Sequence, residues 1–98
     1  MEHIIKRDGK VVAFDSNKIK IAITKAFEST KEVNYTEEEQ EIIINKVIEK
    51  IIALKKDQTI EQIQDTVEKQ LLKTAPMVGK NFLIYRRERT KIRNKKQN

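Results

Sequence analysis

The sequence predicts an α+β fold that is mostly α, in which an N-terminal β-hairpin caps a four-helix bundle. Three observations support this fold class. Two short β-prone runs flank an Asp-Gly pair near the N-terminus, and four later segments repeat apolar residues at helical spacing. Polar residues of the kind that cap helix N-termini stand before three of these segments. Whether a third short strand near residues 57–59 extends the hairpin into a small three-stranded sheet is left open, because no clear pattern marks it.

The hairpin is expected to comprise residues 3–7 and 10–14, with the Asp-Gly pair between them as its turn. This dipeptide is typical of a type I′ turn, because that turn requires positive φ at both central residues. A two-residue turn would place Ile5 opposite Val12. The sequence therefore predicts both the position of the ribbon and its register.

The first helix is expected to begin after the capping residues 15–17 and to end near residues 29–30. The second helix follows the Thr36–Glu39 capping box and continues to about Leu54. Three consecutive isoleucines at residues 42–44 could also form a strand. The sustained helical period and the acidic first turn favour a helix.

The third helix is expected after a second capping box, Thr59–Gln62, and should end before Pro76. The last helix should run from about Val78 into the basic C-terminal end. A chain of 98 residues is the size of one small domain. We therefore predict residues 1–94 as the folded unit and residues 95–98 as a basic disordered tail.

The composition excludes several classes of protein. The chain has no cysteine and one histidine, which excludes disulfides, thiol chemistry, Cys-based zinc sites and His clusters. No apolar run approaches the roughly 18 residues of a membrane span, and the N-terminus lacks the pattern of a secretory signal. We therefore expect a soluble, cytoplasmic protein without a membrane partner.

The net charge of +6 is concentrated at one end of the chain. Basic and acidic residues balance up to residue 85, whereas residues 86–98 contain seven Lys or Arg and one Glu. Cations are favoured near a helix C-terminus by the helix dipole, so this segment has a simple structural explanation. Nucleic-acid binding by the basic end stays an alternative that the scarcity of aromatic residues disfavours.

No catalytic or metal-binding motif is recognisable in the sequence. The chain lacks a Gly-x-Ser-x-Gly motif, a Walker A loop and the spacing of an EF-hand. The consecutive acids Glu37, Glu38 and Glu39 are better explained as partners of a helix dipole than as a general acid–base pair. We therefore expect no catalytic residue and no metal site, and the sequence disfavours an ordinary enzyme.

A group of cations surrounds the predicted hairpin and the helix after it. Lys6 and Arg7 precede the turn, and Lys18 lies in the first turn of the following helix. From the pattern alone, solvated surface charges are the simpler interpretation. A lysine in a first helical turn is disfavoured by the dipole, however, unless an anion binds there. Free backbone N–H groups at the helix start, together with these cations, would suit a phosphate.

Several segments together resemble the ATP-cone, a domain found at the N-terminus of many ribonucleotide reductases and in a bacterial repressor of their genes. The segments that carry the resemblance are Lys6-Arg7-Asp8-Gly9, Asp15, Lys18-Ile19, Thr59–Ile63, Thr66-Val67 and Tyr85–Arg89. The likeness covers nearly the whole chain, and the Arg-rich ending is most similar to the cones of anaerobic reductases. It implies a four-helix bundle that binds ATP or dATP beneath the hairpin.

The resemblance also implies roles for individual residues. The phosphate-binding residues would be Lys6, Arg7, Lys18 and either Arg87 or Arg89. The residues near the base and ribose would be Ile4, Val12, Asp15, Thr59, Gln64 and Thr66. Whether Mg²⁺ accompanies the nucleotide is left open.

By this resemblance the chain would be an allosteric domain that controls the activity or oligomerisation of a ribonucleotide reductase. Its expected partners are an adenine nucleotide and a reductase catalytic domain or another cone, and a homo-oligomer is left open. The alternatives are a nucleic-acid-binding module or a helical protein-interaction module that uses the isoleucines at residues 42–44. The repressor relatives carry a zinc ribbon, which the absence of cysteine excludes here.

Overall fold

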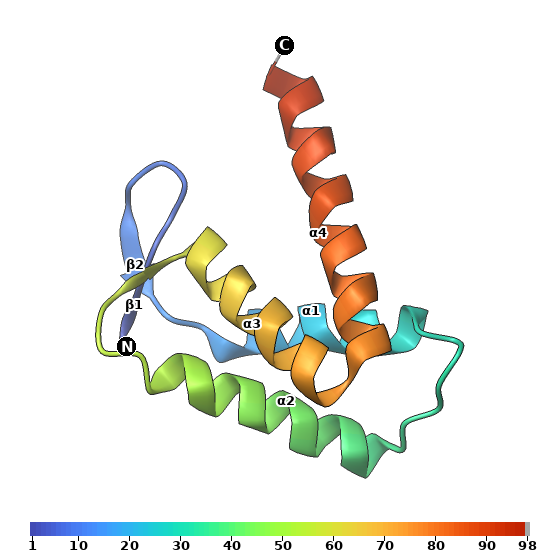
Figure 1. The fold of residues 1–98 in the computed structure, drawn as a ribbon. Coiled ribbons are helices and arrows are strands. Elements are labelled where there is room, and N and C mark those ends of the chain that lie inside the picture. Colours follow the sequence, from blue (N-terminus) through green and yellow to red (C-terminus); the bar gives the residue numbers. More distant parts are fainter. Residues whose placement is uncertain (98) are drawn as a thin grey trace.

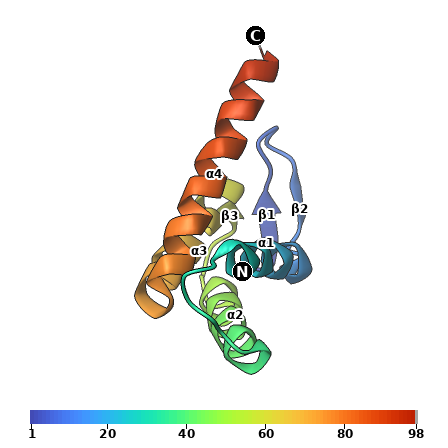
Figure 2. The ribbon, with the colours of Figure 1, turned by 90° about the vertical axis from the view of Figure 1, so that its right-hand side faces the viewer.

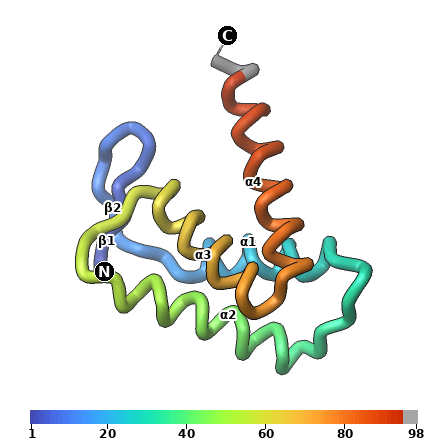
Figure 3. Tube along the Cα trace, viewed as in Figure 1, coloured from blue at the N-terminus to red at the C-terminus, as the bar shows by residue number. Residues whose placement is uncertain are grey.

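A computed structural model describes the backbone of residues 1–97 and the side chains of residues 1–94 (Figures 1 and 3). Within this part, four helices and three short strands occur in the order β1 (His3–Ile5), β2 (Val11–Ala13), α1 (Ser16–Ser29), α2 (Glu37–Ile52), β3 (Gln58–Thr59), α3 (Ile60–Thr74) and α4 (Pro76–Gln97). The predicted mostly helical α+β class is confirmed. The backbone of α4 overlaps the tail predicted at residues 95–98. Asn98 lies outside the described residues, and the disorder of the tail stays a prediction.

The helices form a layered bundle next to the hairpin. Helix α2 packs against α1 and α3, and α4 packs against the same two helices from the other side. The hairpin and the C-terminal half of α4 project toward the same side of this bundle (Figures 1 and 2). The region between them is therefore walled by the hairpin, α1, α3 and α4.

The hairpin turn differs from the predicted type I′ turn. The N–H of Lys6 donates to the carbonyl of Lys10, and the N–H of Gly9 donates to the carbonyl of Lys6. Gly9 has a φ of 86°, but no other described residue has positive φ, so Asp8 does not adopt the conformation that a type I′ turn needs. A type I turn followed by a left-handed glycine makes a three-residue loop, which fits these bonds.

The longer loop shifts the strand register by one residue. Ile4 lies opposite Val12, and Ile5 lies opposite Val11. The predicted pairing of Ile5 with Val12 is therefore wrong. Opposite residues share a face of the ribbon, so Ile4 and Val12 lie on the same face.

A third strand, which the sequence left open near residues 57–59, is present as β3. It pairs parallel to β1, with Ile4 beside Gln58 and Ile5 beside Thr59. The strand order is β2-β1-β3. Because β3 leads directly into α3, this pairing joins the hairpin to the N-terminus of that helix.

Local capping explains the starts of three helices. The Asp15 side chain accepts a backbone N–H in the first turn of α1. Helices α2 and α3 both begin with reciprocal capping boxes, made by Thr36 with Glu39 and by Thr59 with Gln62. These caps lie where the sequence predicts them.

Helix α4 begins at Pro76, two residues before the predicted start near Val78. Proline suits the first position of a helix, because its missing N–H has no partner there in any case. Only Ala75 separates α3 from α4. Pro76 therefore ends one helix and begins the next.

The core lies between the four helices. Its buried apolar residues are Ile23, Ala26, Phe27, Ile44, Val47, Ile48, Ile51, Ile63, Val67, Leu71, Ala75, Val78 and Phe82. Helix geometry places the consecutive isoleucines of α2 on different faces of the helix. Ile44 therefore lies in the core, whereas Ile42 is 56% exposed. Among the described helices, none combines the length and the apolar character needed to cross a membrane.

Candidate functional site

Two neighbouring cavities occupy the region between the hairpin and α4. The first, called here the cationic cavity, has a volume of about 370 Å³. Its lining residues are Arg7, Lys18, Ile19, Ala22, Gln64, Val67, Phe82, Tyr85, Arg86, Arg89 and Arg93. Five of these side chains are cationic and none is acidic, so the cavity is suited to a strongly anionic group.

The second cavity, called here the hairpin cavity, lies between the ribbon and the start of α1 and has a volume of about 430 Å³. Its lining residues are Ile4, Lys6, Val12, Ala13, Asp15, Lys18, Ile19 and Ile60. The observed register explains why Ile4 and Val12 both line it, since they share one face of the ribbon. The cavity is mostly apolar, which suits a flat, weakly polar group.

Lys18 and Ile19 line both cavities. They belong to the first turn of α1, which contains no acidic side chain. The first backbone N–H groups of a helix lack intrahelical partners and carry partial positive charge. The boundary between the cavities therefore combines a lysine with the positive end of a helix.

The structure brings most of the predicted site residues to these cavities. Those that line the cationic cavity are Arg7, Lys18, Gln64 and Arg89, and those that line the hairpin cavity are Ile4, Lys6, Val12, Asp15 and Lys18. One carboxylate oxygen of Asp15 accepts the N–H of Asn17, at 3.0 Å, so this side chain also caps α1. Segments that are far apart in the sequence thus meet at one place.

Three predicted site residues lie elsewhere. Arg87 lines neither cavity and instead lines a separate groove beside Glu68. The rotation of α4 therefore brings Arg89, and not Arg87, to the cationic cavity. The Thr59 hydroxyl accepts the N–H of Gln62 as a cap, and the Thr66 hydroxyl donates to the carbonyl of Gln62. Neither threonine lines either cavity.

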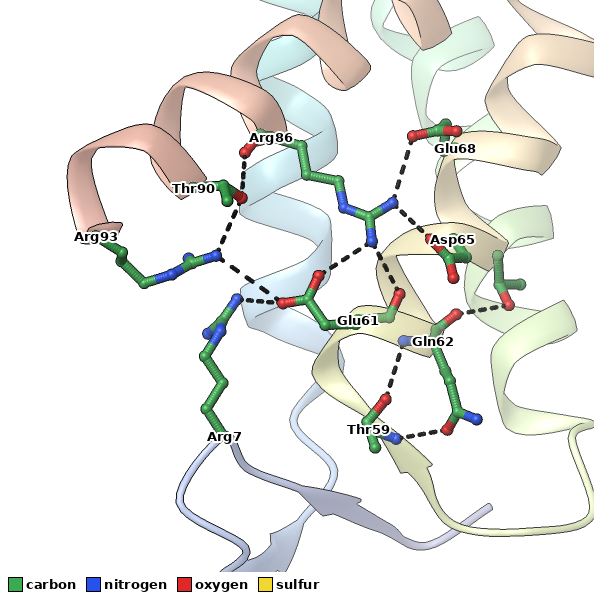
Figure 4. Close-up of polar contacts among 10 residues, drawn as sticks. Arg7, Thr59, Glu61, Gln62, Asp65, Glu68, Arg86, Thr90 and Arg93 are labelled. Carbon is green, nitrogen blue, oxygen red and sulfur yellow. Dashed lines mark hydrogen bonds and ion pairs between the residues drawn. The ribbon is translucent and has the colours of Figure 1, made fainter. Parts of the chain in front are cut away.

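An arginine–carboxylate cluster at the edge of the cationic cavity is absent from the sequence prediction (Figure 4). Glu61, near the start of α3, accepts from Arg7 at 2.9 Å and from Arg86 at 3.1 Å, and it lies 4.0 Å from Arg93. We call these four residues the Glu61 cluster. It connects the hairpin tip, α3 and α4 through one carboxylate.

Arg86 has the most enclosed position in the Glu61 cluster. Its side chain is 17% exposed, and it also approaches Asp65 at 2.7 Å and Glu68 at 3.4 Å. The hydrogen bond from Arg86 is the main cause that holds the pKa of Glu61 below its usual value of 4.5. Burial opposes this, and Arg7 adds to it. Burial also opposes the charge of Arg86, but hydrogen bonds to Asp65 and Glu61 raise its pKa overall.

The spacing of charged residues in the sequence is consistent with the Glu61 cluster. Glu61, Asp65 and Glu68 are spaced four and three residues apart, which places them along one face of α3. Arg86 and Arg93 are seven residues apart and share a face of α4 in the same way. Two oppositely charged faces on consecutive helices suggest an ion-pair seam.

The acidic residues do not form a metal site in the part of the chain that the structure describes. No three His, Asp or Glu side chains there are grouped so that they could hold a metal ion. The side chains that line the two cavities offer hydrogen bonding and charge pairing, next to apolar groups.

Comparison with known proteins identifies the family. The family model for the ATP cone domain matches residues 2–91, which is most of the chain. This chain belongs to the ATP-cone family. ATP-cones are allosteric, nucleotide-binding regulatory domains.

The relatives of this ATP-cone are ribonucleoside-diphosphate reductases. The vitamin B12-dependent ribonucleoside-diphosphate reductase of Thermoplasma acidophilum is 37% identical over 106 residues, which covers 99% of this chain and 13% of that protein. The ribonucleoside-diphosphate reductase subunit alpha of Chlamydia pneumoniae is 36% identical over 101 residues, covering 95% of this chain and 10% of that protein. This ATP-cone thus spans about a tenth of the length of these reductases. Neither name specifies an anaerobic enzyme, so the closer likeness to anaerobic reductases stays a prediction.

Proposed function

We propose that this ATP-cone binds one ATP or dATP across the two cavities, with the base in the hairpin cavity and the phosphates in the cationic cavity. The observation that carries the proposal is the shared boundary: Lys18 and Ile19 line both cavities. A nucleotide has the same division into a flat base and an anionic chain of phosphates. Family membership independently supports a nucleotide ligand.

On the base side, Ile4 and Val12 would cover one face of the adenine. Both side chains point from the ribbon into the hairpin cavity, and Ile60 lines its wall at the start of α3. Val12 is 41% exposed, so a base bound against it would remove apolar surface from water. Asp15 would lie near the ribose.

On the phosphate side, Arg7, Lys18 and Arg89 would supply charge from the wall of the cationic cavity, and Lys6 would reach the phosphates from the hairpin cavity, which it lines. A triphosphate carries up to about four negative charges, so four cations are a proportionate match. Charge-assisted hydrogen bonds contribute about 1.5–3 kcal/mol each. Two or three of these with base burial would reach micromolar affinity, or about −8 kcal/mol. Mg²⁺ bound to the phosphates would share the charge neutralisation.

The biological consequence would be control of a ribonucleotide reductase. The relatives are reductases in which the matching segment is a small part of a much longer chain. A nucleotide can shift the activity or oligomeric state of such an enzyme only by its differential affinity for the two states. A coupling of about 1–3 kcal/mol would suffice.

Isothermal titration calorimetry tests the proposal. We expect ATP and dATP to bind at micromolar concentrations, and GTP to bind more weakly. The Lys18→Ala variant should lose at least about tenfold in affinity, because one charge-assisted bond is removed. Lys46→Ala is the matched control, since Lys46 is exposed on α2 and lines neither cavity. Circular dichroism of both variants would establish that the fold is intact.

Two further arms of the experiment test the alternatives. Binding of a short DNA duplex that fades between low and moderate salt, with no nucleotide binding, would favour the nucleic-acid module. Absence of nucleotide binding together with a concentration-dependent mass would favour the interaction module. Equal affinity of Lys18→Ala and wild-type protein for ATP would contradict the proposed site.

A further inference from the structure

The Glu61 cluster places a carboxylate beside arginines that face the cationic cavity. Arg7, Arg86 and Arg93 all line this cavity, and all three approach Glu61 (Figure 4). Glu61 itself does not line the cavity. An anion of the protein is thus already paired with the cations that a ligand anion would meet.

The arginines of the cluster fall into two classes. Arg86 is mostly enclosed and has three carboxylate partners, Glu61, Asp65 and Glu68, which fix it in place. The side chains of Arg7 and Arg93 are 42% and 36% exposed, and Glu61 is their only ion-pair partner among the described residues. Exposed ion pairs of this kind are weak, so Arg7 and Arg93 can change partner at small cost.

We propose that Glu61 is a specificity-determining residue that competes with the distal phosphates of the nucleotide for Arg7 and Arg93. This inference rests on the proposed nucleotide site. Arg7 and Arg93 line the cationic cavity only, whereas Lys18 stands at its boundary with the hairpin cavity. A single phosphate near Lys18 would leave the cluster intact. A chain of three phosphates extends further into the cationic cavity and can displace the carboxylate.

The competition has a consequence for ligand choice. A phosphate group offers more charge and more acceptor oxygens than one carboxylate, so it can displace Glu61 from an arginine. The Glu61 carboxylate weakens the binding of any ligand that needs Arg7 or Arg93. Only a ligand with several phosphates reaches these arginines and takes the place of the carboxylate. Glu61 therefore lowers the affinity of the site for the nucleotide. It also makes the pairing of Arg7, at the hairpin tip, depend on whether distal phosphates are bound.

Titration of three proteins with ATP and AMP tests the inference. Glu61→Gln removes the charge and should bind ATP about threefold to tenfold more tightly, the range expected for the loss of one or two exposed ion pairs. Its affinity for AMP should stay within about twofold of wild type, because a single phosphate leaves the pairs of Arg7 and Arg93 with Glu61 intact. Asp65→Asn is the matched control, because it removes the same charge one turn along α3 and contacts Arg86 but neither Arg7 nor Arg93. It should leave ATP affinity unchanged.

The outcomes separate this inference from the proposed function. If wild-type protein binds neither nucleotide, both fail. If it binds ATP but Glu61→Gln binds ATP equally or less well with an intact circular dichroism spectrum, only the competition fails. An equal gain for ATP and AMP, or an equal gain in Asp65→Asn, would indicate a general charge effect and would also overturn it.

A spectroscopic measurement reports on the arginines directly. In ¹⁵N-labelled wild-type protein, saturating ATP should shift the side-chain Nε–H signals of Arg7 and Arg93 while that of Arg86 stays in place. AMP should leave all three signals unchanged. An Arg7 signal that does not move at saturating ATP would show that its pairing with Glu61 persists, contrary to the inference.

Discussion

At the scale of single residues, the rotation of α4 separates cations with different roles. Arg86 and Arg89 are three residues apart and both line the cationic cavity. Arg86 is held by three carboxylates of α3, whereas no ion pair of Arg89 occurs among the described residues. Arg87, between them, points into another groove. One arginine therefore stabilises the packing of α3 on α4, and another is available to a ligand.

The pKa of Glu61 makes the stability of the fold depend on pH. Its pKa in the folded protein is lowered from the usual 4.5, so the folded state favours the ionised carboxylate. The resulting stabilisation is fully present above pH 4.5 and is lost as the pH falls through the folded-state pKa. We expect Glu61→Gln to lower the free energy of unfolding at pH 7 by less than about 1 kcal/mol, because the side chain is half exposed.

Urea denaturation of both proteins between pH 7 and pH 3 measures this effect. The difference in unfolding free energy between wild type and Glu61→Gln should shrink as the pH falls below 4.5. A difference that stays constant over this range would show that the carboxylate charge makes no contribution.

At the scale of the elements, one residue at the junction of β3 and α3 has two structural roles. Thr59 is the last residue of β3, where it pairs with Ile5, and it is also the N-cap of α3. The resemblance to ATP-cones places Thr59 near the base and ribose, but its hydroxyl accepts the N–H of Gln62. Its structural role can therefore be separated from its predicted binding role.

We expect Thr59→Ala to lower the free energy of unfolding by about 1 kcal/mol, because the cap of α3 is lost. Thr59→Ser retains the hydroxyl and should cost less. The measurement is urea denaturation followed by circular dichroism, combined with ATP titration of both variants. If Thr59→Ser keeps stability and also keeps ATP affinity, the Thr59 methyl group has no part in binding. Equal stability of Thr59→Ala and wild type would mean that the cap is dispensable.

The elements also show which features the sequence can predict. Caps such as Asp15 and Thr36 act within one turn, so their position in the sequence determines where a helix begins. The turn at Asp8-Gly9 is different, because this dipeptide occurs in two-residue and in three-residue loops. The choice between them moved the register by one residue. Strand β3 has two residues and exists only through its pairing with β1, which no local pattern specifies.

At the scale of the whole molecule, the close crossing of α3 and α4 determines where the cavity walls stand. A Cβ atom added at Gly79 would lie 2.7 Å from the backbone nitrogen of Leu72 and 3.0 Å from the carbonyl carbon of Leu71. Only glycine allows the two backbones to approach so closely. The direction of α4, and with it the position of Arg89 and Arg93, depends on this contact.

We therefore expect Gly79→Ala to destabilise the fold by about 1–3 kcal/mol, although alanine is the better helix former. The backbone of α3 would have to move, since no flexible side chain can yield at this contact. Urea denaturation measures the change, with Lys80→Ala at the neighbouring exposed position as the control. A Gly79→Ala protein as stable as wild type would show that α3 and α4 can move apart enough to fit a Cβ atom without loss of stability.

The site was predictable to the extent that it depends on local pattern and family likeness. Lys6, Arg7 and Lys18 were predicted as phosphate-binding residues because they flank a turn and a helix start, and the structure places them at the two cavities. The choice of Arg89 over Arg87, and the pairing of Glu61 with three arginines, depend on how α4 rotates against α3. That rotation follows from packing of the complete bundle, and a linear pattern leaves it undetermined.

The parallel pairing of β1 with β3 joins residues that are 54 positions apart. During synthesis, residues 3–5 leave the ribosome long before their partners at residues 58–59 exist. Closing such a long loop costs chain entropy that local helix formation does not incur. A nascent chain can therefore form α1 before β3 is available to pair with β1. The two cavities are then among the last parts of the domain to form.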